Sequence, residues 1–154
     1  MRRNSDRGWR LGYIAAPVAI AAAVDSIQSH STSNPTSFAQ IGALAGLKGD
    51  QGFIGEMVKA FAGRRESMYD RLTKIPGITC VKPMGAFYML PNISHFGLGS
   101  ESFCTKLLEQ QKVACVPGIA FGSDAHMRLS YASSMENITK GLDRLEAFCN
   151  GLKA

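Results

Sequence analysis

The sequence lacks the cysteine and histidine patterns that mark metal sites and disulfide-exchange sites. Its four cysteines, Cys80, Cys104, Cys115 and Cys149, are scattered, with no C-x-x-C pair, and none of the three histidines lies at ligand spacing from them. We therefore expect no bound metal, and free thiols in a reducing compartment.

Long apolar runs and clustered charge are also absent. No segment reaches the run of about 18 apolar residues that a membrane-spanning helix needs. The net charge of +5 owes much to four arginines among the first ten residues, and beyond residue 10 the two signs are mixed. A nucleic-acid-binding face would gather Lys and Arg along one surface, with aromatic residues between them. We therefore expect neither nucleic acid nor membrane as a partner.

What the chain does contain is enough apolar sequence for about one globular domain, because 45% of its 154 residues are hydrophobic and 19% are charged. Helical and strand patterns alternate, which indicates an α/β fold with a short mixed sheet. We expect helices over residues 18–27, 36–47, 50–75 and 100–111, and from 133 or 134 onward. We expect strands over residues 78–81, 86–90, 113–116 and 126–132. Ser100 or Ser102 is expected to cap the fourth helix.

The first 25 residues admit two interpretations. A basic start, an apolar run over 11–24 and small residues at 21–23 are typical of a secretory signal. However, Pro17 interrupts the run, and the alternation over residues 10–15 favours a short strand. A secreted small domain behind such a signal is therefore an alternative to a strand at the edge of a larger fold.

Two arginines stand out because apolar residues flank them. Arg10 heads the predicted first strand and Arg128 lies within the last, where a cation is costly unless it is paired. Each could pair with an internal Asp or Glu, or its planar fork of donors could bind a carboxylate or phosphate. Alternation in the last strand turns Met127, Leu129 and Tyr131 to one face, so Arg128 should point to the other.

Six short motifs occur in a fixed order along the chain. They are GWRLGYIAAP (8–17), SNPTS (33–37), PGI (76–78), GAFY (85–88), VPG with FG (116–118 and 121–122) and RLSYA (128–132). In this order they are closely similar to the C-terminal part of the class I pyridoxal-phosphate-dependent aminotransferases. The bacterial-type aspartate aminotransferase group, with its aspartate/glutamate-prephenate enzymes, is the best match. The resemblance runs from residue 6 onward.

The resemblance implies roles for both arginines. Arg10 matches the family arginine that clamps the phosphate of pyridoxal 5'-phosphate, and Arg128 matches the arginine that grips the substrate α-carboxylate. The implied activity is amino transfer between an amino acid, aspartate in the first place, and a 2-oxo acid. A homodimer is expected for the family, located in the cytoplasm or in a plastid or other organelle.

The sequence departs from its family at the lysine that forms the Schiff base. The family pattern places this lysine eight residues before the phosphate arginine, which here falls on Arg2. A guanidinium, with a pKa above about 12, is never the free amine that attacks an aldehyde. No catalytic residue is therefore assigned, and binding of the cofactor by this chain alone is doubtful.

The resemblance also implies a domain organisation. Residues 1–49 would be a remnant of the large cofactor-binding domain, and residues 50–154 the small C-terminal domain with its long linking helix. As a fragment, the chain should be inactive on its own. An alternative is a non-catalytic interaction module that pairs with a full-length aminotransferase.

Overall fold

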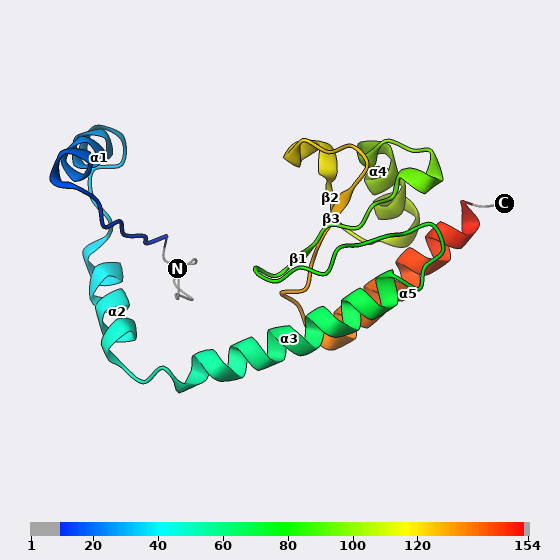
Figure 1. The fold of residues 1–154 in the computed structure, drawn as a ribbon, viewed down its shortest axis with the longest axis horizontal. Helices are drawn as coiled ribbons and strands as arrows, with labels where there is room; N and C mark the ends of the chain where they lie inside the picture. The colour runs from blue at the N-terminus through cyan, green and yellow to red at the C-terminus, as the bar shows by residue number, and fades with distance from the viewer. Residues whose placement is uncertain (1–9, 153–154) are drawn as a thin grey trace. The chain divides into compact units, whose positions relative to one another are not determined.

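The computed structural model describes residues 10–152, and the chain divides into two compact units with the boundary between Gly55 and Glu56. The first unit contains α1 (Val18–Ser31), α2 (Ser37–Lys48) and the start of the long helix α3 (Gly52–Leu72) (Figure 1). No helix within residues 10–152 is long and apolar enough to cross a membrane.

Both predicted helices of the first unit are present, and α1 is longer than expected. Its start is at Pro17, whose carbonyl accepts hydrogen bonds from the N–H groups of Ile20 and Ala21. The polar run after Ile27 does not stop the helix at once, because the Ser29 and Ser31 hydroxyls bond to carbonyls one turn back, at 2.9 and 2.8 Å. The helix ends before Ser33, whose φ of 61° is left-handed.

The strand predicted over residues 10–15 is wrong. Residues 11–17 have no regular secondary structure, and Arg10 itself has a φ of 58°, which is incompatible with an extended strand. Alternating side chains make a strand only where a neighbouring strand supplies backbone hydrogen bonds. Within the described part of the first unit the structure contains helices and loops, so this segment has no ladder to join.

The first unit has little core of its own. Helix α1 buries no residue and α2 buries only Ala39. Large apolar side chains of the two helices are at least half exposed: Val18, Ile20, Ile27, Phe38, Ile41, Leu44 and Leu47. Exposure on this scale is typical of a surface that another polypeptide covers.

The second unit contains a three-stranded sheet in the order β1-β3-β2. Its strands are β1 (Tyr88–Met89), β2 (Val116–Pro117) and β3 (Met127–Ser130). Both pairings are antiparallel, so the expected mixed sheet is wrong for the described strands. The strand predicted over 78–81 is reduced to a single bridge between Thr79 and Asn92.

Helices α4 (Ser100–Gln111) and α5 (Met135–Gly151) complete this unit, together with short 3₁₀ turns η2 (Ser94–Phe96) and η3 (Gly118–Phe121). Helix α5 begins as predicted at Ser134, whose hydroxyl accepts a hydrogen bond from the Asn137 N–H at 3.2 Å. Its apolar stripe packs on α4 and the sheet.

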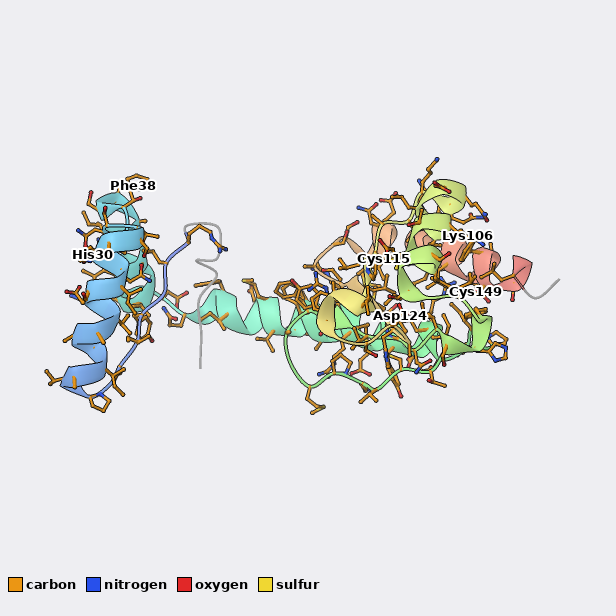
Figure 2. The ribbon with its side chains drawn as sticks, turned by 90° about the horizontal axis from the view of Figure 1, so that it is seen from above. His30, Phe38, Lys106, Cys115, Asp124 and Cys149 are labelled. Carbon is orange, nitrogen blue, oxygen red and sulfur yellow. The ribbon has the colours of Figure 1, made fainter. Side chains whose placement is uncertain are left out.

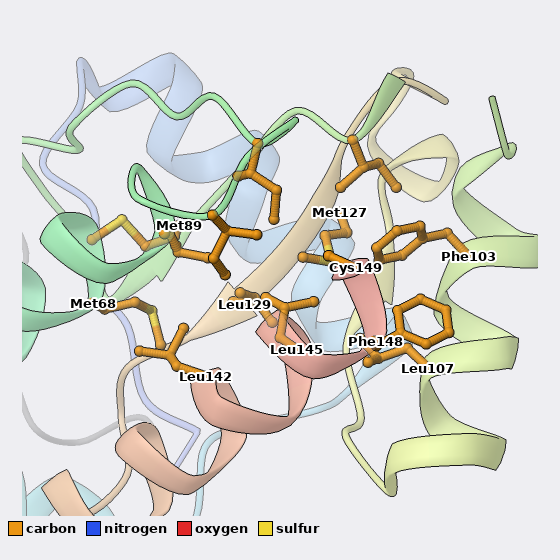
Figure 3. Close-up of a cluster of buried hydrophobic side chains, with 14 of the residues drawn as sticks. Met68, Met89, Phe103, Leu107, Met127, Leu129, Leu142, Leu145, Phe148 and Cys149 are labelled. Atoms are coloured by element: carbon orange, nitrogen blue, oxygen red, sulfur yellow. The ribbon is translucent and has the colours of Figure 1, made fainter. Parts of the chain in front are cut away.

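The core of the second unit lies between these elements (Figure 3). The end of α3 contributes Met68 and Leu72, and α5 contributes one side chain per turn. Buried apolar residues of the sheet, α4 and α5 are Met89, Phe103, Cys104, Leu107, Met127, Leu129, Ile138, Leu142, Leu145, Phe148 and Cys149. Each large side chain buried in this way stabilises the fold by roughly 1.5 to 3 kcal/mol.

Candidate functional site

The alternation predicted for the last strand is present in β3, where Met127 and Leu129 are buried and Arg128 is only partly so. The core therefore takes the flanking side chains, and the guanidinium of Arg128 lies on the opposite face of the sheet. Among residues 10–152, no Asp or Glu forms an ion pair with Arg128, because the ion pairs there involve Arg65, Arg71 and Lys82. For Arg128, the internal-pair interpretation is thus wrong within the described residues.

Two aromatic rings take the place of an acidic partner. The Arg128 guanidinium carbon lies 4.4 Å from the ring centroid of Tyr88 and 4.4 Å from that of Phe121. Cation–π attraction of this kind contributes about 0.5 to 2 kcal/mol, depending on how far water is excluded. Because the N–H donors of a guanidinium lie in its plane, a ring that approaches one of its faces leaves the donor edge for a planar acceptor.

The segment that carries Phe121 is tied to the start of α4. Asp124, which Figure 2 labels, follows Phe121 by three residues. Its carboxylate accepts hydrogen bonds from the Ser100 N–H and hydroxyl at 2.8 and 2.7 Å. Ser100 is fully buried, and its hydroxyl oxygen accepts from the Ile119 N–H at 3.1 Å. The hydrogen bonds from Ser100 lower the pKa of the Asp124 carboxyl below its ordinary value.

This arrangement corrects the cap predicted for α4. Neither Ser100 nor Ser102 is the N-cap, because that position is Gly99, which offers no side chain. Asp124, 24 residues later, accepts from the helix N-terminus instead. Capping patterns compare residues a few positions apart in the sequence, so they do not predict a cap from a distant residue.

Arg10, the other predicted binding residue, belongs to the first unit, whereas Arg128 belongs to the second. Arg10 is exposed at the head of the loop that leads to α1. Arg2, the position that the family pattern gives to lysine, lies outside the described residues. The structure thus brings Arg128 together with Tyr88 and Phe121, two residues that the motifs contain but for which the sequence suggested no role.

Several other charged groups of the second unit form structural contacts. Glu66 accepts hydrogen bonds from Arg65 and Lys82, which lower the pKa of its carboxyl, and Arg71 pairs with two acids of α5. Among residues 10–152, the four cysteines form no disulfide. Within the described residues, no group of three or more His, Cys, Asp or Glu side chains could hold a metal ion.

The motif order, the fold and the placement of Arg128 can now be set against known proteins. The family model "Aminotransferase class I and II" matches residues 7–145. The chain belongs to the class I and II aminotransferases. This confirms the resemblance seen in the six motifs and the α/β fold class that it implied.

Curated relatives of this aminotransferase chain agree on the subgroup. It is 43% identical over 152 residues to the aspartate aminotransferase of Geobacillus stearothermophilus, covering 96% of this chain and 39% of that protein. It is 46% identical over 144 residues to a probable aspartate/prephenate aminotransferase of Aquifex aeolicus, covering 90% of this chain and 36% of that protein. The chain therefore spans well under half the length of these relatives.

Solved structures give the same result. The aspartate aminotransferase from Rhizobium meliloti superposes with a TM-score of 0.85 at 36% identity, covering 93% of this chain and 38% of the other. That from Thermotoga maritima superposes with a TM-score of 0.84 at 42% identity, covering 93% of this chain and 36% of the other. The two-unit architecture is thus that of the matching part of an aminotransferase.

Aminotransferases of class I depend on pyridoxal phosphate, so the chain's residues can be tested for their fit to this group. Arg10 is an exposed residue at the family position for the phosphate, and a guanidinium is a group that suits a phosphate. None of the lysines lies in any of the six motifs, and the pattern position of the lysine is Arg2. The residues present therefore fit the phosphate end of the cofactor but not its covalent attachment.

Proposed function

We propose that this chain is the C-terminal portion of an aminotransferase that exchanges an amino group between aspartate and a 2-oxo acid. In this proposal Arg128 holds the substrate α-carboxylate and Arg10 holds the phosphate of the cofactor. The observation that carries it is the state of Arg128, whose guanidinium carbon lies 4.4 Å from each of two ring centroids and which has no ion-pair partner among residues 10–152. A substrate carboxylate is the planar anion that its donor edge fits.

The names of the relatives support aspartate as the amino donor. The first curated relatives are aspartate aminotransferases, and others are aspartate/prephenate aminotransferases. Fixing the α-carboxylate orients the amino group, so that the reacting groups meet in an almost unimolecular way. That is the contribution which the second unit would make to the reaction.

We further propose that the chain does not catalyse transamination alone. In the family the cofactor acts as the electron sink, and its attachment needs a lysine that Arg2 cannot replace. Residues 1–49 would be the remnant of a large cofactor domain and residues 50–154 the small domain. The exposed apolar helices of the first unit support this division. A homodimer and a cytoplasmic or organellar location stay predictions.

A chimera tests the activity. Residues 6–154 of this chain would follow the part of the Geobacillus stearothermophilus aspartate aminotransferase that this chain does not match, including the segment where the pattern places the lysine. We expect pyridoxal phosphate to bind and aspartate to transaminate 2-oxoglutarate. A folded chimera that binds pyridoxal phosphate but leaves aspartate and 2-oxoglutarate unchanged would overturn the proposal.

The 154-residue chain itself provides the complementary test. Mixed with pyridoxal phosphate and reduced with borohydride, it should show no site-specific lysine adduct by mass spectrometry, because no lysine occupies the family position. Stoichiometric labelling of a single lysine would show that the chain has an attachment site of its own.

A further inference from the structure

We propose that Tyr88 and Phe121 are positioning residues for Arg128: together they hold its guanidinium so that the donor edge, rather than a face, meets a carboxylate. This inference rests on the proposed function, in which Arg128 binds the substrate carboxylate. It adds two residues that act through Arg128, without a contact to the substrate being assumed for either.

The sheet register explains how Tyr88 reaches the guanidinium. Tyr88 in β1 lies opposite Ser130 in β3, so Arg128 is its diagonal neighbour on the same face. Diagonal neighbours in an antiparallel pair are about 7 to 8 Å apart, within reach of an aromatic ring and a long side chain. Tyr131 fixes this segment from the other side, because its N–H bonds to the Phe87 carbonyl at 2.9 Å and its hydroxyl to the Ala86 carbonyl at 3.0 Å.

Phe121 comes from a different element, at the end of η3, and the hydrogen bonds of Ser100 fix that element. The Ile119 N–H binds the Ser100 hydroxyl oxygen, and Asp124 holds Ser100. Gly118 closes the same turn, since a Cβ there would clash with the carbonyl oxygens of Ser123 and His126. Phe121 is therefore held over Arg128 although its own ring is half exposed.

Holding the guanidinium has a physical value for binding. A free arginine side chain loses rotamer freedom when a ligand fixes it, which weakens binding. Where two rings have already fixed it, that loss occurs on folding, and the carboxylate meets a preorganised fork of donors. Rings over the faces of the guanidinium would leave its edge for a ligand, which favours a bidentate carboxylate over a spherical anion.

Side-chain NMR of the full 154-residue chain tests the inference, with sodium propionate as a simple carboxylate probe. The two rings should shift the Arg128 side-chain protons upfield, and propionate should shift the Arg128 Nε–Hε signal. We expect Phe121→Leu and Tyr88→Leu each to reduce the upfield shift and to raise the propionate Kd about threefold to tenfold. Phe121→Tyr and Tyr88→Phe, which keep a ring, should restore both values.

Ile119→Ala is the matched control, because Ile119 is an exposed apolar residue of the same turn and carries no aromatic ring to place over the guanidinium. It should leave the propionate Kd unchanged. If propionate binds at Arg128 equally well in the leucine variants and the original chain, the positioning role is overturned while the proposed function stands. If Arg128 in the original chain does not respond to propionate, the carboxylate role itself fails. Phe121→Leu alone decides the matter if Tyr88→Leu does not fold, since the Phe121 ring is half exposed.

Discussion

At the scale of single residues, Arg128 shows how a charge can lie beside apolar neighbours without an acidic partner. Its aliphatic stem leaves β3 between two buried side chains, while its head is covered by Tyr88 and Phe121. Aromatic faces carry partial negative charge and so stabilise a cation without neutralising its donors. A guanidinium in this setting keeps its hydrogen-bonding edge for a ligand.

Replacing Arg128 by lysine in the active chimera should separate charge from geometry. Lysine keeps the stem and the positive charge, but it has no planar fork to bind a carboxylate through two hydrogen bonds. We expect the fold to persist and kcat/KM to fall. The fall should correspond to a loss of transition-state stabilisation on the order of 2 to 4 kcal/mol. Steady-state kinetics with aspartate and 2-oxoglutarate measure this loss.

The control for that experiment is Arg144→Lys, a partly exposed arginine of α5 that has no ion pair with any of residues 10–152. Its kcat/KM should match that of the unchanged chimera. If Arg128→Lys also stays within about threefold, which is under 1 kcal/mol, then Arg128 is not the carboxylate anchor.

A second prediction for a single residue concerns how the stability of the fold depends on pH through Asp124. The hydrogen bonds from Ser100 lower the pKa of the Asp124 carboxyl from the ordinary 3.8. A carboxyl with a lowered folded-state pKa stabilises the fold at pH values above its unfolded pKa. That stabilisation should be lost as the pH falls below about 3.8 towards the lowered folded-state pKa. Asp124→Asn should therefore destabilise the second unit at pH 6 and show less further loss on acidification.

Urea unfolding followed by circular dichroism at pH values from about 2.5 to about 6 measures this dependence, because that range includes the ordinary pKa of a carboxyl. Asp70→Asn is the control, because Asp70 is exposed and its carboxylate takes part in no ion pair among residues 10–152. Equal acid sensitivity of the Asp124→Asn chain and the unchanged chain would show that this carboxylate does not contribute.

At the scale of elements, the helices could be predicted from the sequence, whereas the sheet could be predicted only in part. The 3.6-residue period of α5 requires only local information, and its buried residues Ile138, Leu142, Leu145 and Phe148 follow it. Strands depend on partners far along the chain. In the described first unit, residues 10–15 have no partner strand. Residues 78–81 form a backbone bridge to a partner only at Thr79.

The candidate site was predictable to a similar extent. The RLSYA motif and strand alternation together identified Arg128 and the face on which it lies. The rings over it could not be identified, because Tyr88 and Phe121 come from elements 40 and 7 residues before Arg128. Their meeting depends on the register of β1 and on the tie between η3 and α4, which are tertiary features.

The stripe of α5 gives a stability prediction for the second unit. Leu145 is 1% exposed and faces the core, so Leu145→Ala removes buried methyl groups and leaves a cavity. We expect a loss of roughly 2 to 5 kcal/mol in the free energy of unfolding, measured by urea denaturation. Lys140→Ala, at an exposed position of the same helix, should change it by less than about 0.5 kcal/mol. A loss below about 1 kcal/mol for Leu145→Ala would place this side chain outside the core.

At the scale of the whole molecule, the two units differ in how well they bury their own apolar residues. The core cluster of buried residues runs from Met68 to Cys149 and lies entirely within the second unit. The first unit leaves side chains such as Val18 and Ile41 at 86% and 70% exposure. An interaction module that pairs with another aminotransferase chain would use this same apolar surface, so its behaviour bears on both functional proposals.

We therefore expect the 154-residue chain to self-associate and the polypeptide of residues 50–154 to be largely monomeric. Apolar surfaces of this extent associate in water because association removes them from solvent. Light scattering over a range of protein concentrations measures the mass of each. The shorter polypeptide retains the complete core cluster, so its fold should persist, with the same protection of the backbone amides of the core in hydrogen exchange.

Substitution within the full chain separates the apolar surface from chain length. Ile41→Gln combined with Leu44→Gln makes two exposed positions of α2 polar and should shift the chain towards monomer. Glutamine is a good helix former, so α2 itself should persist. Val81→Gln is the matched control, since Val81 is 88% exposed but lies in the second unit. If the full chain and residues 50–154 are both monomeric at the same concentrations, the helices of the first unit are not a surface that awaits a partner. The division into a large-domain remnant and a small domain would then lose its main physical support.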